Sequence, residues 1–301
     1  MLYTDLAVEA AELRTAGRTI PGKLDGAVTT HEEKDGFSAD IVELLDENGE
    51  KLLEKPKGKY ITLDIRPALK PGSEMFRTAC ELLGEYLRAL LPADGCALVA
   101  GLGNRAITPD AVGPACADAI FVTRHLRARM PELFGMFRPV MASAPGVLGT
   151  TGIETAEYLR ALVHETKPDF VIAVDALMAR RISRLGATVQ LTDTGVSPGS
   201  GLGTNTAKLD RAYLGVPVIA LGVPTIVDAA TLAIDTMREA GLDVPDEDAV
   251  RANAKGMIVT SKDIDRESTV CARLLAFGIN LALQSGMDFD ALGAYLGAAG
   301  A

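Results

Sequence analysis

The chain shows two hydrophobic patterns along most of its length. From about residue 70, short apolar runs alternate with longer stretches in which apolar residues recur every three or four positions. The short runs predict buried strands and the longer stretches predict amphipathic helices. We expect helices at 1–20, 73–91, 112–129, 153–166, 177–184, 226–240 and 268–285, and a short one at the C-terminus. We expect strands at 97–100, 139–142, 170–174, 188–191 and 216–221.

Residues 24–65 have a different character. Apolar and β-branched runs at 26–28, 37–45 and 60–65 predict strands, and Asp35-Gly36 and Asn48-Gly49 are typical of hairpin turns between them. This spacing indicates a small antiparallel meander. The basic stretch Lys55–Lys59 is expected to be a solvated turn.

The alternation of strands and helices predicts an α/β protein with three layers, α/β/α, around a mostly parallel twisted sheet. We find no internal repeat and no low-complexity linker, so we expect one domain over 1–301, with the meander at 24–65 as an embellishment. The apolar stretch 214–234 contains Gly and Pro residues, which favour a buried strand, a turn and a helix start over a membrane span.

Composition narrows the classes of function. Of 301 residues, 48% are hydrophobic, and 30 Lys+Arg against 40 Asp+Glu give a net charge of −10. That charge argues against binding nucleic acid through its phosphates. The four cysteines are scattered and no secretory signal is visible at the N-terminus, which favours reduced thiols in a cytoplasm. The sequence contains neither HExxH nor GxSxG, the signatures of many zinc and serine hydrolases.

Two aspartates follow predicted strands. Asp110 lies after the Gly-containing exit from strand 97–100, and Asp175 directly ends strand 170–174. Each residue could simply cap the following helix. Alternatively, if the two strands are neighbours, both carboxyl groups lie at one sheet edge, where one keeps a proton. Such a pair can supply a base to activate water and an acid for the leaving group.

A third acidic motif is less specific. Asp193-Thr194-Gly195 spells the active-site triplet of pepsin-like proteases, but those enzymes are all-β and require two copies of it. Here a turn after strand 188–191 explains it. The Gly-rich segment 197–203, which contains Ser200, either borders a substrate cleft or forms a plain surface loop.

Six groups of motifs follow one another along the chain: Tyr3-Thr4-Asp5-Leu6-Ala7-Val8-Glu9-Ala10, Gly101-Leu102-Gly103-Asn104 with Thr108-Pro109-Asp110, Pro145-Gly146-Val147 with Thr151-Gly152-Ile153-Glu154-Thr155, Asp175-Ala176-Leu177 with Ala179-Arg180, Asp193-Thr194-Gly195 with Pro198-Gly199-Ser200-Gly201, and Leu214-Gly215-Val216-Pro217-Val218-Ile219-Ala220 with Gly222-Val223-Pro224-Thr225 and Val227-Asp228-Ala229. In order and spacing, from residue 3 to about 240, they resemble the germination protease of spore-forming bacteria, peptidase family A25.

The resemblance implies an aspartic-type endopeptidase that degrades small acid-soluble spore proteins during germination, in the cytoplasm of the spore core. Its two essential aspartates fall on Asp110 and Asp175, and no cofactor or metal is implied. The fold would be similar to that of hydrogenase maturation proteases. Gly103, Asn104, Arg180, Asp193 and Ser200 are candidates for the substrate cleft or its support.

The same resemblance implies a self-processing zymogen and a homotetramer. The family's substrate site looks like Thr-Glu-Phe/Ile-Ala-Ser-Glu, cut after the first Glu, and Thr4–Glu9 follows that pattern. We therefore expect self-cleavage between Asp5 and Leu6, with residues 1–5 as a short propeptide. Two alternatives stay open: a metal-assisted peptidase of the maturation type, and a binding module without enzymatic activity.

Overall fold

The computed structural model describes residues 4–15, 22–70, 74–199 and 207–299. Its strands are β1 (Gly22–Leu24), β2 (Ala27–Lys34), β3 (Phe37–Leu44), β4 (Gly58–Asp64), β5 (Ala97–Gly101), β6 (Val140–Ser143), β7 (Phe170–Ala179), β8 (Thr188–Thr192), β9 (Val218–Asp228) and β10 (Ile258–Val259). Its α-helices are α1 (Ala7–Arg14), α2 (Glu47–Leu53), α3 (Met75–Leu90), α4 (Val112–Asp118), α5 (Arg124–Arg129), α6 (Pro131–Phe134), α7 (Leu148–Thr151), α8 (Thr155–Thr166), α9 (Arg211–Leu214), α10 (Ala229–Glu239), α11 (Glu247–Asn253), α12 (Ile264–Leu283) and α13 (Phe289–Ala299). Three 3₁₀ turns complete the list: η1 (Arg66–Leu69), η2 (Thr108–Asp110) and η3 (Ile182–Arg184).

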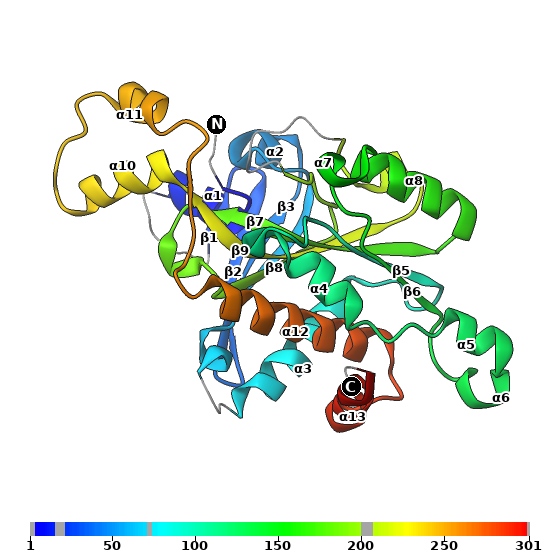
Figure 1. Ribbon diagram of the computed structural model, residues 1–301. Coiled ribbons are helices and arrows are strands. Elements are labelled where there is room, and N and C mark those ends of the chain that lie inside the picture. Colours follow the sequence, from blue (N-terminus) through cyan, green and yellow to red (C-terminus); the bar gives the residue numbers. More distant parts are fainter. Residues whose placement is uncertain (1–3, 16–21, 71–73, 200–206, 300–301) are drawn as a thin grey trace.

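All the strands belong to one ten-stranded sheet with the order β1-β2-β3-β4-β8-β9-β7-β5-β6, and β10 pairs with β9. The predicted α/β class is confirmed (Figure 1). The expectation of a mostly parallel sheet is wrong. Among the described strands, the pairings of β5 with β6, β5 with β7 and β7 with β9 are parallel, and the other pairings are antiparallel. The reason is that the meander does not stand apart: β4 joins β8, so its strands extend the central sheet.

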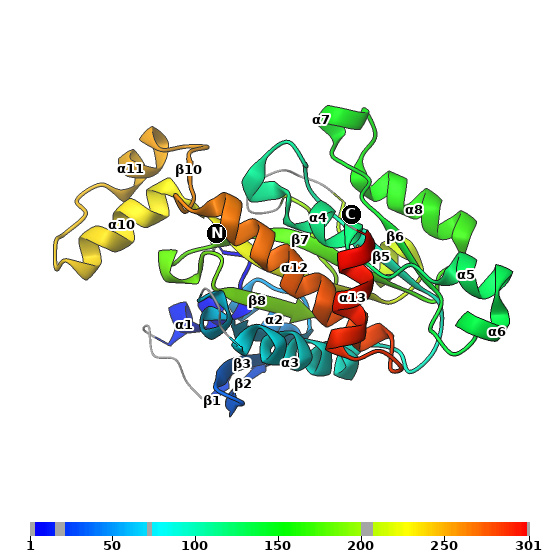
Figure 2. The same cartoon turned by 60° about the horizontal axis from the view of Figure 1, so that its bottom comes forward.

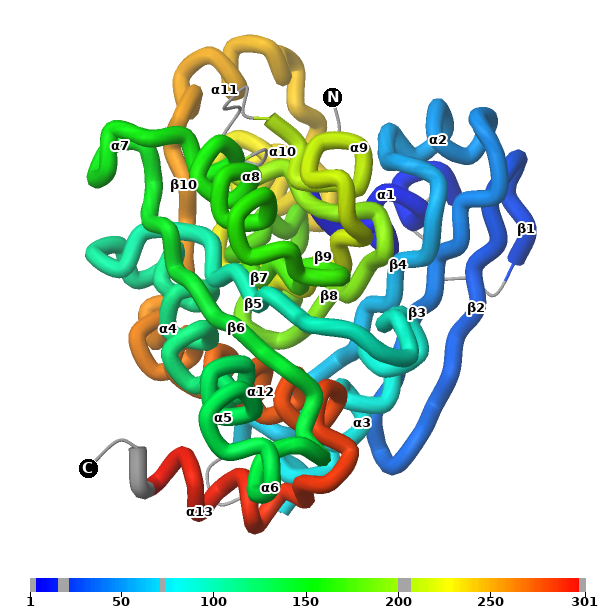
Figure 3. The backbone as a smooth tube through the Cα atoms, turned by 90° about the vertical axis from the view of Figure 1, so that its right-hand side faces the viewer, coloured from blue at the N-terminus to red at the C-terminus, as the bar shows by residue number. Residues whose placement is uncertain are grey.

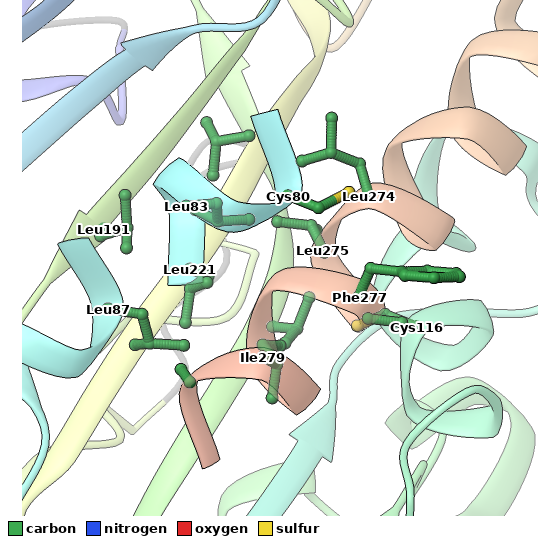
Figure 4. Close-up of a cluster of buried hydrophobic side chains, with 14 of the residues drawn as sticks. Cys80, Leu83, Leu87, Cys116, Leu191, Leu221, Leu274, Leu275, Phe277 and Ile279 are labelled. Atoms are coloured by element: carbon green, nitrogen blue, oxygen red, sulfur yellow. The ribbon is translucent and has the colours of Figure 1, made fainter. Parts of the chain in front are cut away.

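Helices cover both faces of this sheet. Figure 3 shows α8 and α9 on one side of the strands and α3 and α12 on the other. Alternate residues of β7 divide between the two sides: Ile172 and Val174 join the core under α3, α4 and α12, whereas Val171 and Ala173 pack with α8 and α9. Figure 4 shows the larger core, in which Leu274, Leu275 and neighbouring residues of α12 meet α3. This two-sided burial is why the central strands are continuously apolar in sequence.

The predicted helix 112–129 is interrupted. It forms α4 and α5, with residues 119–123 between them. Asn280 of α12 explains the break, because its side-chain oxygen accepts the N–H of Phe121 at 2.8 Å and its amide donates to the carbonyl of Ala119 at 2.9 Å. A buried side chain from a distant helix thus satisfies the backbone groups that a continuous helix would have paired.

Two central strands are much longer than predicted. β7 continues through 175–179, where we expected a helix at 177–184, and β9 runs through Gly222 and Pro224, where we expected a turn. The two strands pair with each other along this extension, with a register shift between Leu177 and Met178 at the proline. Pairing of the backbones has overridden the local signals, since Pro224 lacks only one donor and the bulge accommodates it.

The N-terminal meander is present, but the predicted turn at Asn48-Gly49 is wrong. These residues lie in α2, whose first turn is capped by the carboxylate of Asp46. A Cβ on Gly49 would lie 2.2 Å from the carbonyl oxygen of Gly26, so this close approach requires glycine. α11 and β10 were not expected, and α10 and α11 project from the body of the molecule (Figures 1 and 2).

Within the described ranges, none of the helices is long and apolar enough to cross a membrane.

Candidate active site

The two candidate aspartates meet at one edge of the sheet. Asp110 closes η2 after β5, and Asp175 lies in β7, one residue beyond the pairing of Val174 with Gly101 at the end of β5. The strands before the two residues are therefore direct parallel neighbours, as the sequence hypothesis required. Both carboxyl groups line the same cavity of about 550 Å³.

Asp175 is an unusually buried acid. It is 5% exposed, and its Oδ1 accepts the N–H of Ala176 at 2.9 Å. Burial, reinforced by the negative charges of Asp110 and Asp5, raises the pKa of Asp175 to about 8. The side chain therefore carries its proton at neutral pH. Asp175 stands in mid-strand, so the alternative of a helix cap does not apply to it.

Asp110 has a more polar setting. Its Oδ2 accepts the N–H of Asn104 at 2.7 Å, which opposes the rise in pKa that burial causes. Gly103 has a positive φ of 113°, and a Cβ there would lie 2.1 Å from the backbone oxygen of Asp110. The glycine thus lets the turn close around the carboxylate. The N-cap of α4 is Ala111, and none of the described side chains caps this helix, so Asp110 is not a helix cap either.

The chain's own N-terminal segment lies in this site. Beyond the end of β5, the free edge of β7 pairs with Asp5: the N–H of Asp5 donates to the carbonyl of Met178 at 2.9 Å, and the N–H of Met178 donates to the Asp5 carboxylate at 2.8 Å. Asp5 also lines the cavity beside Asp110 and Asp175. Its bond to Leu6 is the junction that the sequence singled out.

Gln190 of β8 holds both sides of that junction. Its Nε2 donates to the carbonyl oxygen of Asp5 at 3.1 Å, and its Oε1 accepts the N–H of Ala7 at 2.7 Å. Gln190 was not among the candidates predicted from the sequence, although a glutamine in a strand between Val189 and Leu191 is a usable signal, because a buried amide needs partners.

Lys55 corrects the expectation of a solvated turn at its position. It lines the cavity, and its Nζ donates to the carbonyl of Thr4 at 3.4 Å. Burial lowers the pKa of Lys55, while the charges of Asp5 and Glu9 oppose that effect. The amino group of Lys55 therefore lies beside the acidic N-terminal segment.

The other candidates lie at varied distances from this chemistry. The guanidinium of Arg180 pairs with Asp235, and the carboxylate of Asp193 accepts the N–H of Lys59 at 2.9 Å, so both side chains are committed to neighbours and neither lines the cavity. Gly103 and Asn104 support Asp110 directly. Ser200 lies outside the described residues.

Among the residues with described positions, no group of three or more His, Cys, Asp and Glu side chains is arranged to hold a metal ion.

A buried carboxyl group with a raised pKa and a second, more exposed one line the same cavity, and such an arrangement can supply the acid and the base of a hydrolysis. A family model described as germination protease matches residues 7–240. The chain belongs to this family, and it is a protease and hence a hydrolase.

Curated germination proteases are similar over most of their length. The protein of Caldanaerobacter subterraneus subsp. tengcongensis is 41% identical and covers 95% of each chain, and that of Clostridium perfringens strain SM101 is 39% identical over 97% of this chain and 98% of its own. The Bacillus subtilis protein is 41% identical over 79% of this chain and 66% of its own.

Among solved structures, the [NiFe] hydrogenase maturation protease HycI from Thermococcus kodakarensis KOD1 matches with a TM-score of 0.36 and 16% identity. The match covers 64% of this chain and 98% of that one.

Proposed function

We propose that this protein is an aspartic-type endopeptidase of spore germination that degrades small acid-soluble spore proteins in the cytoplasm of the spore core. We propose further that it is made as a zymogen that cuts itself between Asp5 and Leu6, and that the working form is a homotetramer. One observation carries the proposal: the Asp5 residue of that junction lies in the cavity that Asp110 and Asp175 line.

The two carboxyl groups have different roles in the proposed reaction. Asp110 is more exposed than Asp175, so it is the carboxyl group that acts as the ionised base and removes a proton from the attacking water. Asp175, with a pKa of about 8, holds the proton that the departing amine requires. Hydroxide adds to the carbonyl carbon, the C–N bond breaks, and the amine leaves with the proton of Asp175.

Negative charge develops on the carbonyl oxygen during this attack. In the docked segment that oxygen belongs to Asp5, and it already accepts a hydrogen bond from Nε2 of Gln190. The N–H of Asn104 already donates to the Asp110 carboxylate, so it does not serve this role. Gln190 is therefore the side chain that stabilises the oxyanion in our mechanism.

The test is self-processing and peptide cleavage by Asp110→Asn and Asp175→Asn variants of the full chain. We expect each variant to lose cleavage of Thr-Glu-Phe-Ala-Ser-Glu peptides and to keep Met1 at its N-terminus, whereas the parent acquires Leu6 as its first residue. Asp193→Asn, which alters an acid outside the cavity, is the matched control and should remain active.

Other outcomes identify the alternatives. Cleavage that persists in both variants rules out the carboxyl pair. A parent protein that never cuts favours a binding module, and activity that EDTA removes and one divalent ion restores favours a metal-assisted peptidase. Light scattering of the parent measures the assembly directly, and a monomer would remove the tetramer from the proposal.

A further inference from the structure

Glu9 is the most completely buried acidic side chain of the N-terminal segment. It is 1% exposed, although it lies on a helix of only eight residues close to the chain's start. A buried carboxylate is unfavourable unless charge and hydrogen bonds compensate for its lost hydration. The partners of Glu9 therefore show what this position is built to bind.

Three groups just beyond the end of β7 surround the Glu9 carboxylate. Oε2 accepts the backbone N–H of Arg180 at 2.7 Å, Oε1 accepts that of Arg181 at 3.0 Å, and the guanidinium of Arg184 lies 3.7 Å from Oε1. We call these two N–H groups and the Arg184 side chain the carboxylate cradle. Two converging backbone donors with a guanidinium match the shape and charge of a carboxylate.

The Arg184 guanidinium has hydrogen-bonding capacity beyond its contact with Glu9. Arg184 also donates from Nη2 to Glu12 at 2.6 Å, and among the described residues its buried Nη1 has no hydrogen-bond partner. Glu12, like Glu9, belongs to α1. Both acidic partners of Arg184 therefore lie on α1, which stays attached to the chain when the Asp5–Leu6 bond is cut.

The position of Glu9 along the segment is fixed relative to the Asp5–Leu6 bond. Leu6 is fully buried, and the Thr4 hydroxyl both donates to Glu9 and accepts the N–H of Leu6 at 3.1 Å. These contacts close the segment into a compact turn, with a carboxylate four residues after Asp5. A carboxylate bound in the cradle therefore lies at a fixed spacing from the Asp5–Leu6 bond, which faces Asp110 and Asp175.

We infer that the carboxylate cradle is a specificity site, in which Arg184 selects peptides with an acidic side chain four residues C-terminal to the cleaved bond. The inference rests on the proposed function, because it takes Asp5–Leu6 as a bond that the site cuts. In this structure the chain's own Glu9 occupies the cradle, so a second peptide must displace α1 before it binds there.

The experiment uses two peptides that copy residues 2–13 of this chain, one with glutamate and one with glutamine at the position of Glu9. The full-length parent and its Arg184→Gln and Arg184→Lys variants are compared by kcat/KM for both. We expect the parent to prefer the glutamate peptide by roughly ten- to a hundredfold, the effect of one charge-assisted hydrogen-bonding site. Arg184→Gln should reduce that preference about tenfold, and Arg184→Lys, which keeps the charge, should retain part of it.

The ratio of the two peptides is measured within each enzyme, so a loss of folded protein cancels. Arg77→Gln removes an arginine that pairs with Asp290 on α13 and controls for the change in net charge. Equal cleavage of both peptides by the parent overturns the inference and leaves the proposed function intact, as does an unchanged preference in Arg184→Gln. A parent that cuts neither peptide, nor its own Asp5–Leu6 bond, overturns the proposed function and the inference together.

Discussion

Asp175→Asn should make the protein more stable at alkaline pH, in addition to its effect on cleavage. In the folded protein burial raises the pKa of Asp175 to about 8, whereas an aspartate exposed to water has a pKa of 3.8. Between these values the folded chain holds a proton that the unfolded chain has released. The free energy of unfolding therefore falls as pH rises, by about 1.4 kcal/mol per pH unit.

The change in the free energy of unfolding is confined to the pH range between the pKa of Asp175 in the unfolded chain and its pKa in the folded chain. The stabilising contribution of protonated Asp175 is complete below the unfolded pKa, and it is lost as pH rises through about 8. From about pH 5 to about pH 8 the loss is at most about 4 kcal/mol, three units at the slope above. Asparagine does not ionise, so the variant lacks this slope. The variant's advantage over the parent should grow across the same range.

The assay is urea unfolding of both proteins at equal concentration, at several pH values, followed by circular dichroism because the chain has no tryptophan. Asp290→Asn, which alters an exposed acid on α13, is the control and should show no comparable trend. A difference between Asp175→Asn and the parent that stays constant from about pH 5 to about pH 8 would refute the buried, protonated acid.

Three further predictions concern the same cavity. Gly103→Ala forces a Cβ toward the backbone oxygen of Asp110 at a positive φ, so we expect about 1–3 kcal/mol of destabilisation in urea unfolding and slower cleavage; an unchanged midpoint would contradict this close approach. Gln190→Leu removes the donor to the Asp5 carbonyl, so the rate constant of self-processing should fall by roughly a hundredfold. A fall of less than about threefold would contradict an oxyanion role. EDTA treatment should leave kcat unchanged, because the proposed reaction uses only carboxyl groups and an amide; loss of activity that one divalent ion restores would contradict it.

The parts of the fold with strong, regular patterns could be predicted from the sequence. The apolar run before Asp175 and the helical spacing of 268–285 gave correct elements, because each buries a face that the sequence itself marks. The break between α4 and α5 could not be predicted, since the group that stabilises it, the Asn280 amide, comes from about 160 residues further along the chain.

The residues of the candidate site also include some that the sequence predicts and some that it does not. Asp110 and Asp175 could be found because acids that follow parallel strands converge at a sheet edge, whatever the remaining topology is. The place of Gln190 and Lys55 in this cavity could not be predicted, although a glutamine in a buried strand signals that it needs partners, because both residues reach the cavity through the antiparallel pairings of β4 with β8 and of β8 with β9. A mostly parallel sheet would not contain these antiparallel pairings, so that expectation could not position Gln190 or Lys55 beside the cavity.

The wrong prediction for 177–184 concerns the segment on which the proposed function depends. A helix there would have bonded its own N–H and carbonyl groups internally. The strand instead runs past the end of β5, and this leaves Met178 free to pair with Asp5 and the N–H groups of Arg180 and Arg181 free to bind Glu9. Ala, Leu and Met favour a helix locally, but pairing of β7 with β9 holds the segment extended. The unpaired edge of β7 is thus a binding surface for peptide backbone, and it exists only because tertiary pairing overrides the local preference.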